Sequence, residues 1–186
     1  MVKVLVAVAD GTEEMEAVTI TDVLVRAGAQ VCTASVMPQQ LTITASRGIK
    51  LMADCLITDC AAEWDLIALP GGMPGAEHLS NCAPLIELIR TQLAADKWLG
   101  AICAAPAVVL GRHQLISLKT ATCYPGFQAE LAEQVARISQ ERVVVDGKLV
   151  TSQGPGSATE FALTLVQCLF GSDKAQQVAE GLLFPW

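Results

Sequence analysis

The segment Trp98–Leu110 constrains the fold of this 186-residue chain more than any other segment. Residues 99–102 form an uninterrupted apolar run, which is typical of a strand buried on both faces. From Ala104 onward the residues favour a helix, and Pro106 suits only the first turn, where a missing N–H loses no hydrogen bond. The segment therefore predicts a strand, a sharp turn and a helix, with Cys103 at the junction.

Cys103 is a candidate nucleophile because of this position. A thiol beside a helix N-terminus faces the positive end of the helix dipole and unpaired backbone N–H groups, here including that of Ala104. Both favour the reactive thiolate. The arrangement is that of a nucleophile elbow with Cys in place of Ser and without the flanking glycines. A buried cysteine can also serve as a small apolar side chain, so the prediction depends on the position of Cys103 rather than on its type.

Strand-like and helix-like segments alternate along the chain, which predicts an α/β sandwich with a mostly parallel sheet. We find no linker or internal repeat, so we expect residues 1–186 to form one domain. Residues 41–45 and the segment after Gly48 are expected to form antiparallel strands at the edge of the sheet. Residues 56–63 are expected to form a short connector. The predicted strands are 2–9, 30–36, 64–69, 99–102 and 120–124, with a hairpin over 143–150; the predicted helices are 12–27, 85–94, 127–136, 158–169 and 173–183.

The charge balance argues against a stable nucleic-acid partner. The chain has 12 Lys and Arg against 19 Asp and Glu, a net charge of −7, whereas nucleic-acid-binding proteins present basic patches. No apolar run reaches the length of a membrane span, and residues 1–9 lack a signal-peptide pattern. We therefore expect a cytoplasmic protein without a membrane partner.

The sequence offers no pattern for a cofactor or a metal. It contains neither GxGxxG nor a Walker loop. Its seven cysteines include no CxxC pair, and His78 and His113 are its only histidines, so the ligand spacing of zinc sites is missing. We expect no cofactor, no metal site and mostly reduced thiols.

Three loops that follow predicted strands carry residues suited to chemistry. One carries Glu16, one carries Gly71 and Gly72, and the third is the elbow with Cys103. Working residues of parallel sheets gather at the carboxyl ends of the strands. We therefore expect the Glu16 carboxyl group to point towards the elbow and the glycine N–H groups to approach a reacting oxygen.

Taken together, five segments resemble the ThiJ/PfpI superfamily, in the branch of the parkinsonism-associated deglycase and its bacterial relatives. The resemblance extends over essentially the whole chain. Each segment is weakly specific alone, but five in the same order are highly specific. They are residues 10–18 (DGTEEMEAV), 44–48 (TASRG), 69–76 (LPGGMPGA), 101–106 (AICAAP) and 151–156 (TSQGPG).

The resemblance implies a flavodoxin-like three-layer α/β/α sandwich that forms a homodimer. It implies that Cys103 is the low-pKa cysteine and that Glu16 is its protonated partner, which donates a hydrogen bond to the sulfur. A protonated carboxyl group is needed there because an ionised one would raise the thiol pKa. The resemblance also implies a backbone donor, Gly72, and two arginines at the dimer interface and the mouth of the site, Arg26 and Arg47.

The chain departs from the family pattern at Tyr124, where many relatives carry a histidine. His78 and His113 match no catalytic position of the family, so we expect both to be surface or structural residues. Ala104 stands where the peptidase-like branch has a histidine, and the His-x-Glu pair of the glutamine amidotransferases is missing. Peptidase and amidotransferase reactions are therefore disfavoured.

Two functions fit these residues. The first is a cofactor-independent glyoxalase or protein deglycase, in which Cys103 adds to methylglyoxal, glyoxal or their adducts. The second is a redox-sensing chaperone for oxidised client proteins, in which Cys103 is oxidised to a sulfinate without turnover. The expected partners are reactive aldehydes or glycated and oxidised proteins, and the sequence leaves both functions open.

Overall fold

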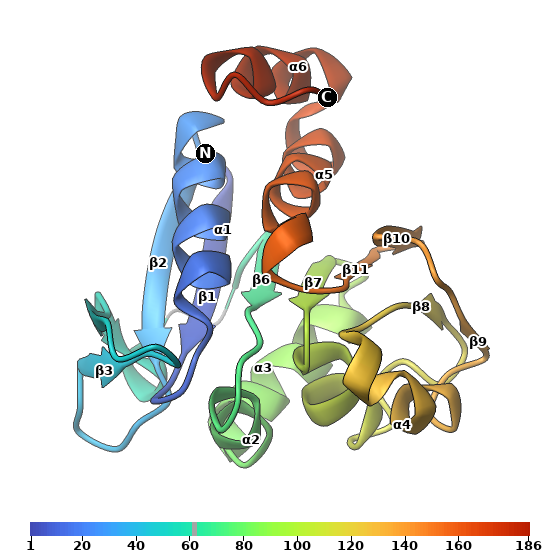
Figure 1. The fold of residues 1–186 in the computed structure, drawn as a ribbon. Coiled ribbons are helices and arrows are strands. Elements are labelled where there is room, and N and C mark those ends of the chain that lie inside the picture. Colours follow the sequence, from blue (N-terminus) through green and yellow to red (C-terminus); the bar gives the residue numbers. More distant parts are fainter. Residues whose placement is uncertain (61–62) are drawn as a thin grey trace.

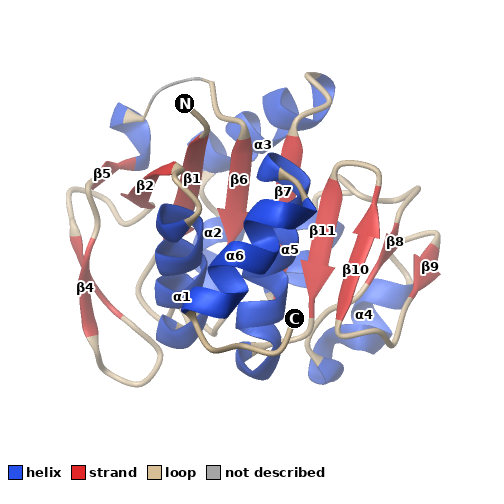
Figure 2. Cartoon of the chain, turned by 90° about the horizontal axis from the view of Figure 1, so that it is seen from above, coloured by secondary structure: helices blue, strands red, loops and turns tan. Residues whose placement is uncertain are grey.

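A computed structural model describes residues 1–60 and 63–186 of the chain, and it contains a central seven-stranded sheet (Figures 1 and 2). The strands of this sheet are β1 (Lys3–Val8), β2 (Gln30–Ser35), β5 (Cys55–Leu56), β6 (Leu66–Leu69), β7 (Trp98–Ile102), β10 (Val143–Asp146) and β11 (Leu149–Ser152). Their spatial order is β10-β11-β7-β6-β1-β2-β5, and only the β10–β11 pair is antiparallel. The predicted mostly parallel α/β sheet is confirmed.

Helices cover both faces of the sheet, because alternate side chains of each strand point to opposite faces. Val4, Val6 and Val8 of β1 belong to one hydrophobic core, and Leu5 and Ala7 belong to the other. The first core lies beneath α1 (Glu14–Arg26), α5 (Ala158–Phe170) and α6 (Ser172–Gly181), which share one face in Figure 2. The second lies beneath α2 (Gly75–Ser80), α3 (Ala83–Ala94) and a π-helix, Pro106–Gly111. This is the flavodoxin-like three-layer sandwich that the resemblance implied.

The remaining elements differ in part from the sequence-based prediction. Strands β3 (Thr42–Thr44) and β4 (Lys50–Met52) do pair antiparallel, but as a separate small sheet and not on the edge of the main one. Strands β8 (Thr120–Ala121) and β9 (Arg137–Ile138) form another pair. Helix α4 spans only Gln128–Ala132 of the predicted helix 127–136.

The predicted connector 56–63 contains structure of its own. Its first residue belongs to β5, which pairs with β2 at the sheet edge, and a 3-10 turn, Ile57–Asp59, follows. Residues 61 and 62 of the connector lie outside the described residues. No helix in the described part of the chain combines the length and the apolar character that crossing a membrane requires.

Candidate active site

The elbow lies where three neighbouring strands end. Strands β1, β6 and β7 are parallel neighbours, so the loops after their carboxyl ends meet at one edge of the sheet (Figure 1). Cys103 follows β7 with φ +64°, in the left-handed region that side chains other than glycine rarely adopt. Its N–H donates to the Ser152 carbonyl over 3.0 Å, and its carbonyl accepts from the Tyr124 N–H over 2.8 Å. Bonds on both sides hold this strained conformation, as a nucleophile elbow requires.

Two glycines make the close approach of the β6 loop to the elbow possible. A Cβ atom on Gly71 would lie 2.6 Å from Cys103 Cβ and 2.8 Å from the Ala104 nitrogen. Gly72 has φ +86°, and a Cβ there would collide with the Glu13 backbone nitrogen. The Gly-Gly pair is therefore a requirement of this packing and not an ordinary turn.

Replacing Gly71 by alanine is expected to destabilise the protein by about 3 kcal/mol, because the new Cβ meets backbone atoms that cannot rotate away. Gly156→Ala is the matched control, since nothing lies within 4 Å of a Cβ at Gly156. Urea unfolding measures the free energy of unfolding of both variants and of the wild type. Equal stability of the two variants would contradict the close packing at the elbow.

Glu16 is the buried acid of the site. It lies in the first turn of α1 and is fully buried. Its Oε2 accepts the Gly71 N–H over 2.7 Å. Its Oε1 is also buried and has no partner with hydrogen-bonding geometry, although the carboxyl group is close enough to the Cys103 thiol for each to shift the pKa of the other. One proton shared between Oε1 and the sulfur would satisfy both groups.

Burial dominates the protonation of this pair. It raises the pKa of Glu16 to about 7, against the lowering effects of the Gly71 N–H and of Cys103. Burial first, and the charge of Glu16 second, raise the pKa of Cys103 to about 12, while the N–H groups of Gly72 and Ala104 lower it. Burial thus favours the protonated form of both groups, so the pair retains its protons more strongly than two exposed groups would.

The sequence predicted a thiol with a low pKa, and the structure adds an opposing effect that the sequence could not supply. Cys103 is only 8% exposed, so desolvation counteracts the N–H donors. Glu16 reconciles the two effects. When Glu16 holds the shared proton, its negative charge is removed and it can donate to the sulfur, whose thiolate form then faces Gly72 and Ala104.

The structure brings Cys103, Glu16, Gly72 and Ala104 together, and it places the Gly71 N–H differently from the expectation. The Gly71 N–H was expected to approach a reacting oxygen, and it is instead used by the Glu16 carboxylate. The Gly-Gly pair in the sequence indicated that backbone N–H groups would approach the site. It did not indicate which of the two glycines would bind the Glu16 carboxyl group.

The two predicted arginines lie in different places. Arg47 lies in the loop after β3 that packs on the start of α1, where its N–H donates to Glu14 Oε1 over 2.8 Å. Arg26 is the last residue of α1, about 15 Å along the helix from Glu16, and its side chain pairs with Asp22 at 2.7 Å. Arg47 is thus near the acid-bearing end of α1, and Arg26 is not.

Tyr124 lies near the elbow. In the described part of the chain, neither His78 nor His113 forms a hydrogen bond with Cys103 or Glu16. The ring of Tyr124 lies against Gly154 and is 46% exposed. His113 Nε2 is bonded to the Ser80 carbonyl over 2.9 Å, which is a structural contact. Imidazole chemistry from the Tyr124 loop is therefore not available to Cys103.

The sequence of this chain is similar to known proteins over most of its length. Residues 2–168 match the DJ-1/PfpI family. The chain is 47% identical to DJ-1 homolog B of Arabidopsis thaliana over 97% of its own length but only 41% of that relative's length, so it spans less than half of that protein. It is 33% identical to the glutathione-independent glyoxalase DJR-1.2 of Caenorhabditis elegans, over 93% of this chain and 91% of that protein.

The fold of this chain is also similar to that of solved structures of DJ-1 proteins. The structure of oxidized DJ-1 from Toxoplasma gondii superimposes with a TM-score of 0.94 at 44% identity, covering 100% of both chains. The similarity thus includes every element that builds the elbow. By its sequence and its fold, the chain belongs to the DJ-1/PfpI family.

Proposed function

We propose that this protein is a cofactor-independent glyoxalase or protein deglycase that acts on methylglyoxal, glyoxal and their adducts. The observation that carries the proposal is the buried Cys103–Glu16 pair, in which the acid lies beside a sulfur that faces the N–H groups of Gly72 and Ala104. The relative named a glutathione-independent glyoxalase supports it. The seven cysteines are free, which fits a reducing compartment such as the cytoplasm.

The reaction needs a nucleophile, one acid–base group and an oxyanion donor. The Cys103 sulfur adds to the aldehyde carbon of methylglyoxal, and the carbonyl oxygen takes up a proton from Glu16 to give a hemithioacetal. Ionised Glu16 then removes the C1 proton, and a proton returns at C2, so that C1 is oxidised and C2 reduced within one molecule. Water hydrolyses the resulting thioester to lactate and frees the thiol. The Gly72 N–H stabilises the developing oxyanion.

The decisive experiment counts lactate formed by the pure protein with methylglyoxal, observed directly by NMR. Observing the product separates turnover from simple trapping of the aldehyde by thiols. We expect many lactate molecules per chain, with Glu16 as the only acid–base group because Tyr124 replaces the family histidine. Lactate that never exceeds one molecule per chain would refute the enzyme.

A redox-sensing chaperone is the second candidate, and the same two N–H donors favour it. A sulfinate on Cys103 would accept hydrogen bonds from Gly72 and Ala104 and from protonated Glu16. This function predicts that a trace of peroxide oxidises Cys103 alone, and that the oxidised protein suppresses aggregation of a client. Mass spectrometry of the oxidised chain, together with the lactate count, separates the two candidates.

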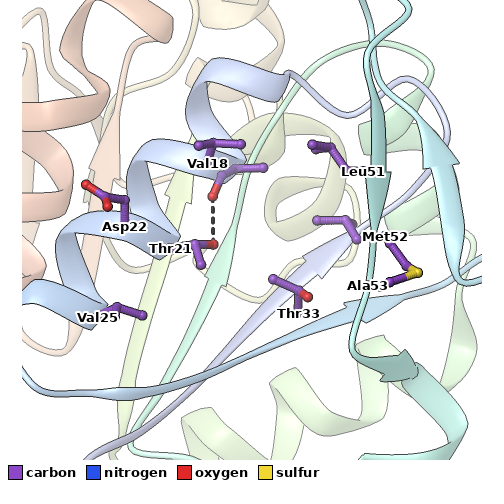
Figure 3. A pocket seen from close by; sticks show the side chains of 10 residues that line it. Val18, Thr21, Asp22, Val25, Thr33, Leu51, Met52 and Ala53 are labelled. Carbon is purple, nitrogen blue, oxygen red and sulfur yellow. Dashed lines mark hydrogen bonds between the residues drawn. The ribbon is translucent and has the colours of Figure 1, made fainter.

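We also propose that the protein forms a homodimer through α1 and the β3–β4 hairpin. A cavity of about 390 Å³ lies between them (Figure 3). Its lining is largely apolar and includes side chains that a monomer exposes, which a second copy of the chain would cover. The lining includes Val18, Asp22, Val25, Leu51 and Met52.

Replacing Val18 by glutamate is expected to convert the dimer into a monomer, because a charge would be buried without a partner. Val145→Glu is the matched control, since Val18 is 51% exposed and Val145, on the distant strand β10, is 50% exposed. Sedimentation equilibrium should give twice the chain mass of 19.6 kDa for the wild type and the control. A Val18→Glu protein that stays dimeric would place the interface elsewhere.

A further inference from the structure

Three cysteines that are distant in the sequence meet at the β5 edge of the main sheet. Cys55 pairs in register with Ala34 of β2, and Cys32 lies two residues before Ala34, so both cysteines point to the same face. Cys60 follows the 3-10 turn Ile57–Asp59, which brings the chain back towards β5. Strand pairing and one turn thus create the cluster, which no spacing motif indicated.

The three sulfurs are close but not bonded to one another. Cys32 Sγ lies 3.5 Å from Cys55 Sγ, and Cys55 Sγ lies 3.3 Å from Cys60 Sγ. All three atoms lie within 4.8 Å of one another. A disulfide would need about 2.05 Å, and all three cysteines are free and half-buried. The cluster therefore presents three converging soft donors that solvent can reach.

We propose that Cys32, Cys55 and Cys60 form a three-sulfur binding site for Cu(I). Three sulfurs about 2.3 Å from an ion at the centre of their plane lie about 4 Å apart, which these side chains reach with small movements. Soft thiolate ligands select Cu(I). On binding, three S–Cu bonds form and each thiol releases its proton to the solvent. Neither copper nor sulfur changes its oxidation state.

The ligand set favours Cu(I) over Zn²⁺, because structural zinc sites use four protein ligands. Within residues 1–60 and 63–186, no fourth Cys, His, Asp or Glu joins the cluster. The nearby carboxylate of Asp54 is already used, since its Oδ2 accepts the N–H and the hydroxyl of Thr33, each over 2.8 Å. The described side chains therefore provide three sulfur ligands, which suits a trigonal site.

This site is separate from the elbow. Strands β6 and β1 lie between β2 and β7, the strand that Cys103 directly follows. At about 4.8 Å per strand, the two sites are roughly 14 Å apart across the sheet. Copper binding at the cluster therefore does not depend on the proposed enzyme activity, and each proposal can fail without the other.

Anaerobic titration of the reduced protein with Cu(I), against a coloured Cu(I) chelator, tests the proposal. We expect one tightly held ion per chain in the wild type and in Cys103→Ser, and X-ray absorption should find three sulfur neighbours. Cys55→Ser should weaken binding on the order of 100-fold or more, since even changes around the ligands cost 10–100-fold. Cys82→Ser removes a half-buried thiol outside the cluster and should bind as the wild type does.

Several results would overturn the site. The ion could be lost in Cys103→Ser and kept in Cys55→Ser, or Zn²⁺ could displace Cu(I) at equal concentration. The reduced protein could also bind no copper, with a mild oxidant joining two of the three sulfurs; the cluster would then be a redox pair. Circular dichroism checks that Cys55→Ser is folded, and Cys60→Ser, outside the regular strands, repeats the test if it is not.

Discussion

Replacing Cys103 by alanine is expected to lower the rate of lactate formation from methylglyoxal by about 10³-fold or more. The thiolate is the only group at the elbow that can form the covalent intermediate, and loss of a catalytic nucleophile costs at least this much in well-studied hydrolases. The fold should survive, because Cys103 is held by its backbone bonds to Ser152 and Tyr124, which alanine keeps.

The control for this prediction is Cys168→Ala, which removes a half-buried thiol on α5. It should form lactate at the wild-type rate, so that any loss in Cys103→Ala is not a general effect of removing a thiol. NMR of the product gives the rate of lactate formation, and urea unfolding gives the stability of each variant. Lactate formation by a folded Cys103→Ala protein at the wild-type rate would refute the assignment of the nucleophile.

Replacing Glu16 by glutamine is expected to lower the rate about 10²- to 10⁴-fold, the usual contribution of a general acid–base group. The amide keeps an oxygen for the Gly71 N–H, so the packing around the elbow is preserved. It cannot exchange a proton with the hemithioacetal. Cys103 should still react with an alkylating agent, which separates loss of proton transfer from loss of the thiol.

The same variant should be more stable than the wild type above neutral pH. The pKa of Glu16 is about 7 in the folded protein, whereas the ordinary pKa of a glutamate side chain is 4.5. Between these values the folded state holds a proton that the unfolded state has lost, so wild-type stability falls as the pH rises through this window, by about 3 kcal/mol in total. Glutamine has no such dependence.

Urea unfolding at pH 4 and pH 8 tests whether wild-type stability falls as the pH rises. The two proteins should have similar free energies of unfolding at pH 4, and Glu16→Gln should exceed the wild type at pH 8. A function that needs a buried acid would then be maintained at a measurable cost in stability. A wild type that loses no stability relative to the variant between pH 4 and pH 8 would show that the Glu16 pKa is not raised.

Local sequence patterns were enough to predict the main elements. The apolar runs at 2–9 and 99–102 became β1 and β7, and the helical spacing up to Gly28 became α1. Such patterns depend on neighbouring residues, which the sequence lists directly. The same reasoning placed Cys103 at the elbow, because a strand followed at once by a helix leaves one residue at the junction.

Short elements were not predictable in this way. Helix α2 has six residues and begins at a glycine, and β5 has two residues. Segments of this length bury too few side chains to show a period, and tertiary contacts decide their conformation. The edge position of β5 follows only from its pairing with β2.

The sequence by itself determined that strands and helices alternate and that a cysteine follows the strand 99–102. Only the tertiary structure decided that Gly71 holds Glu16, that burial raises the pKa of both members of the Cys103–Glu16 pair, and that Cys32, Cys55 and Cys60 converge. The physical reason is the range of the interactions. Periodicity and turns act over a few residues, whereas desolvation and strand pairing join residues that are far apart in the chain.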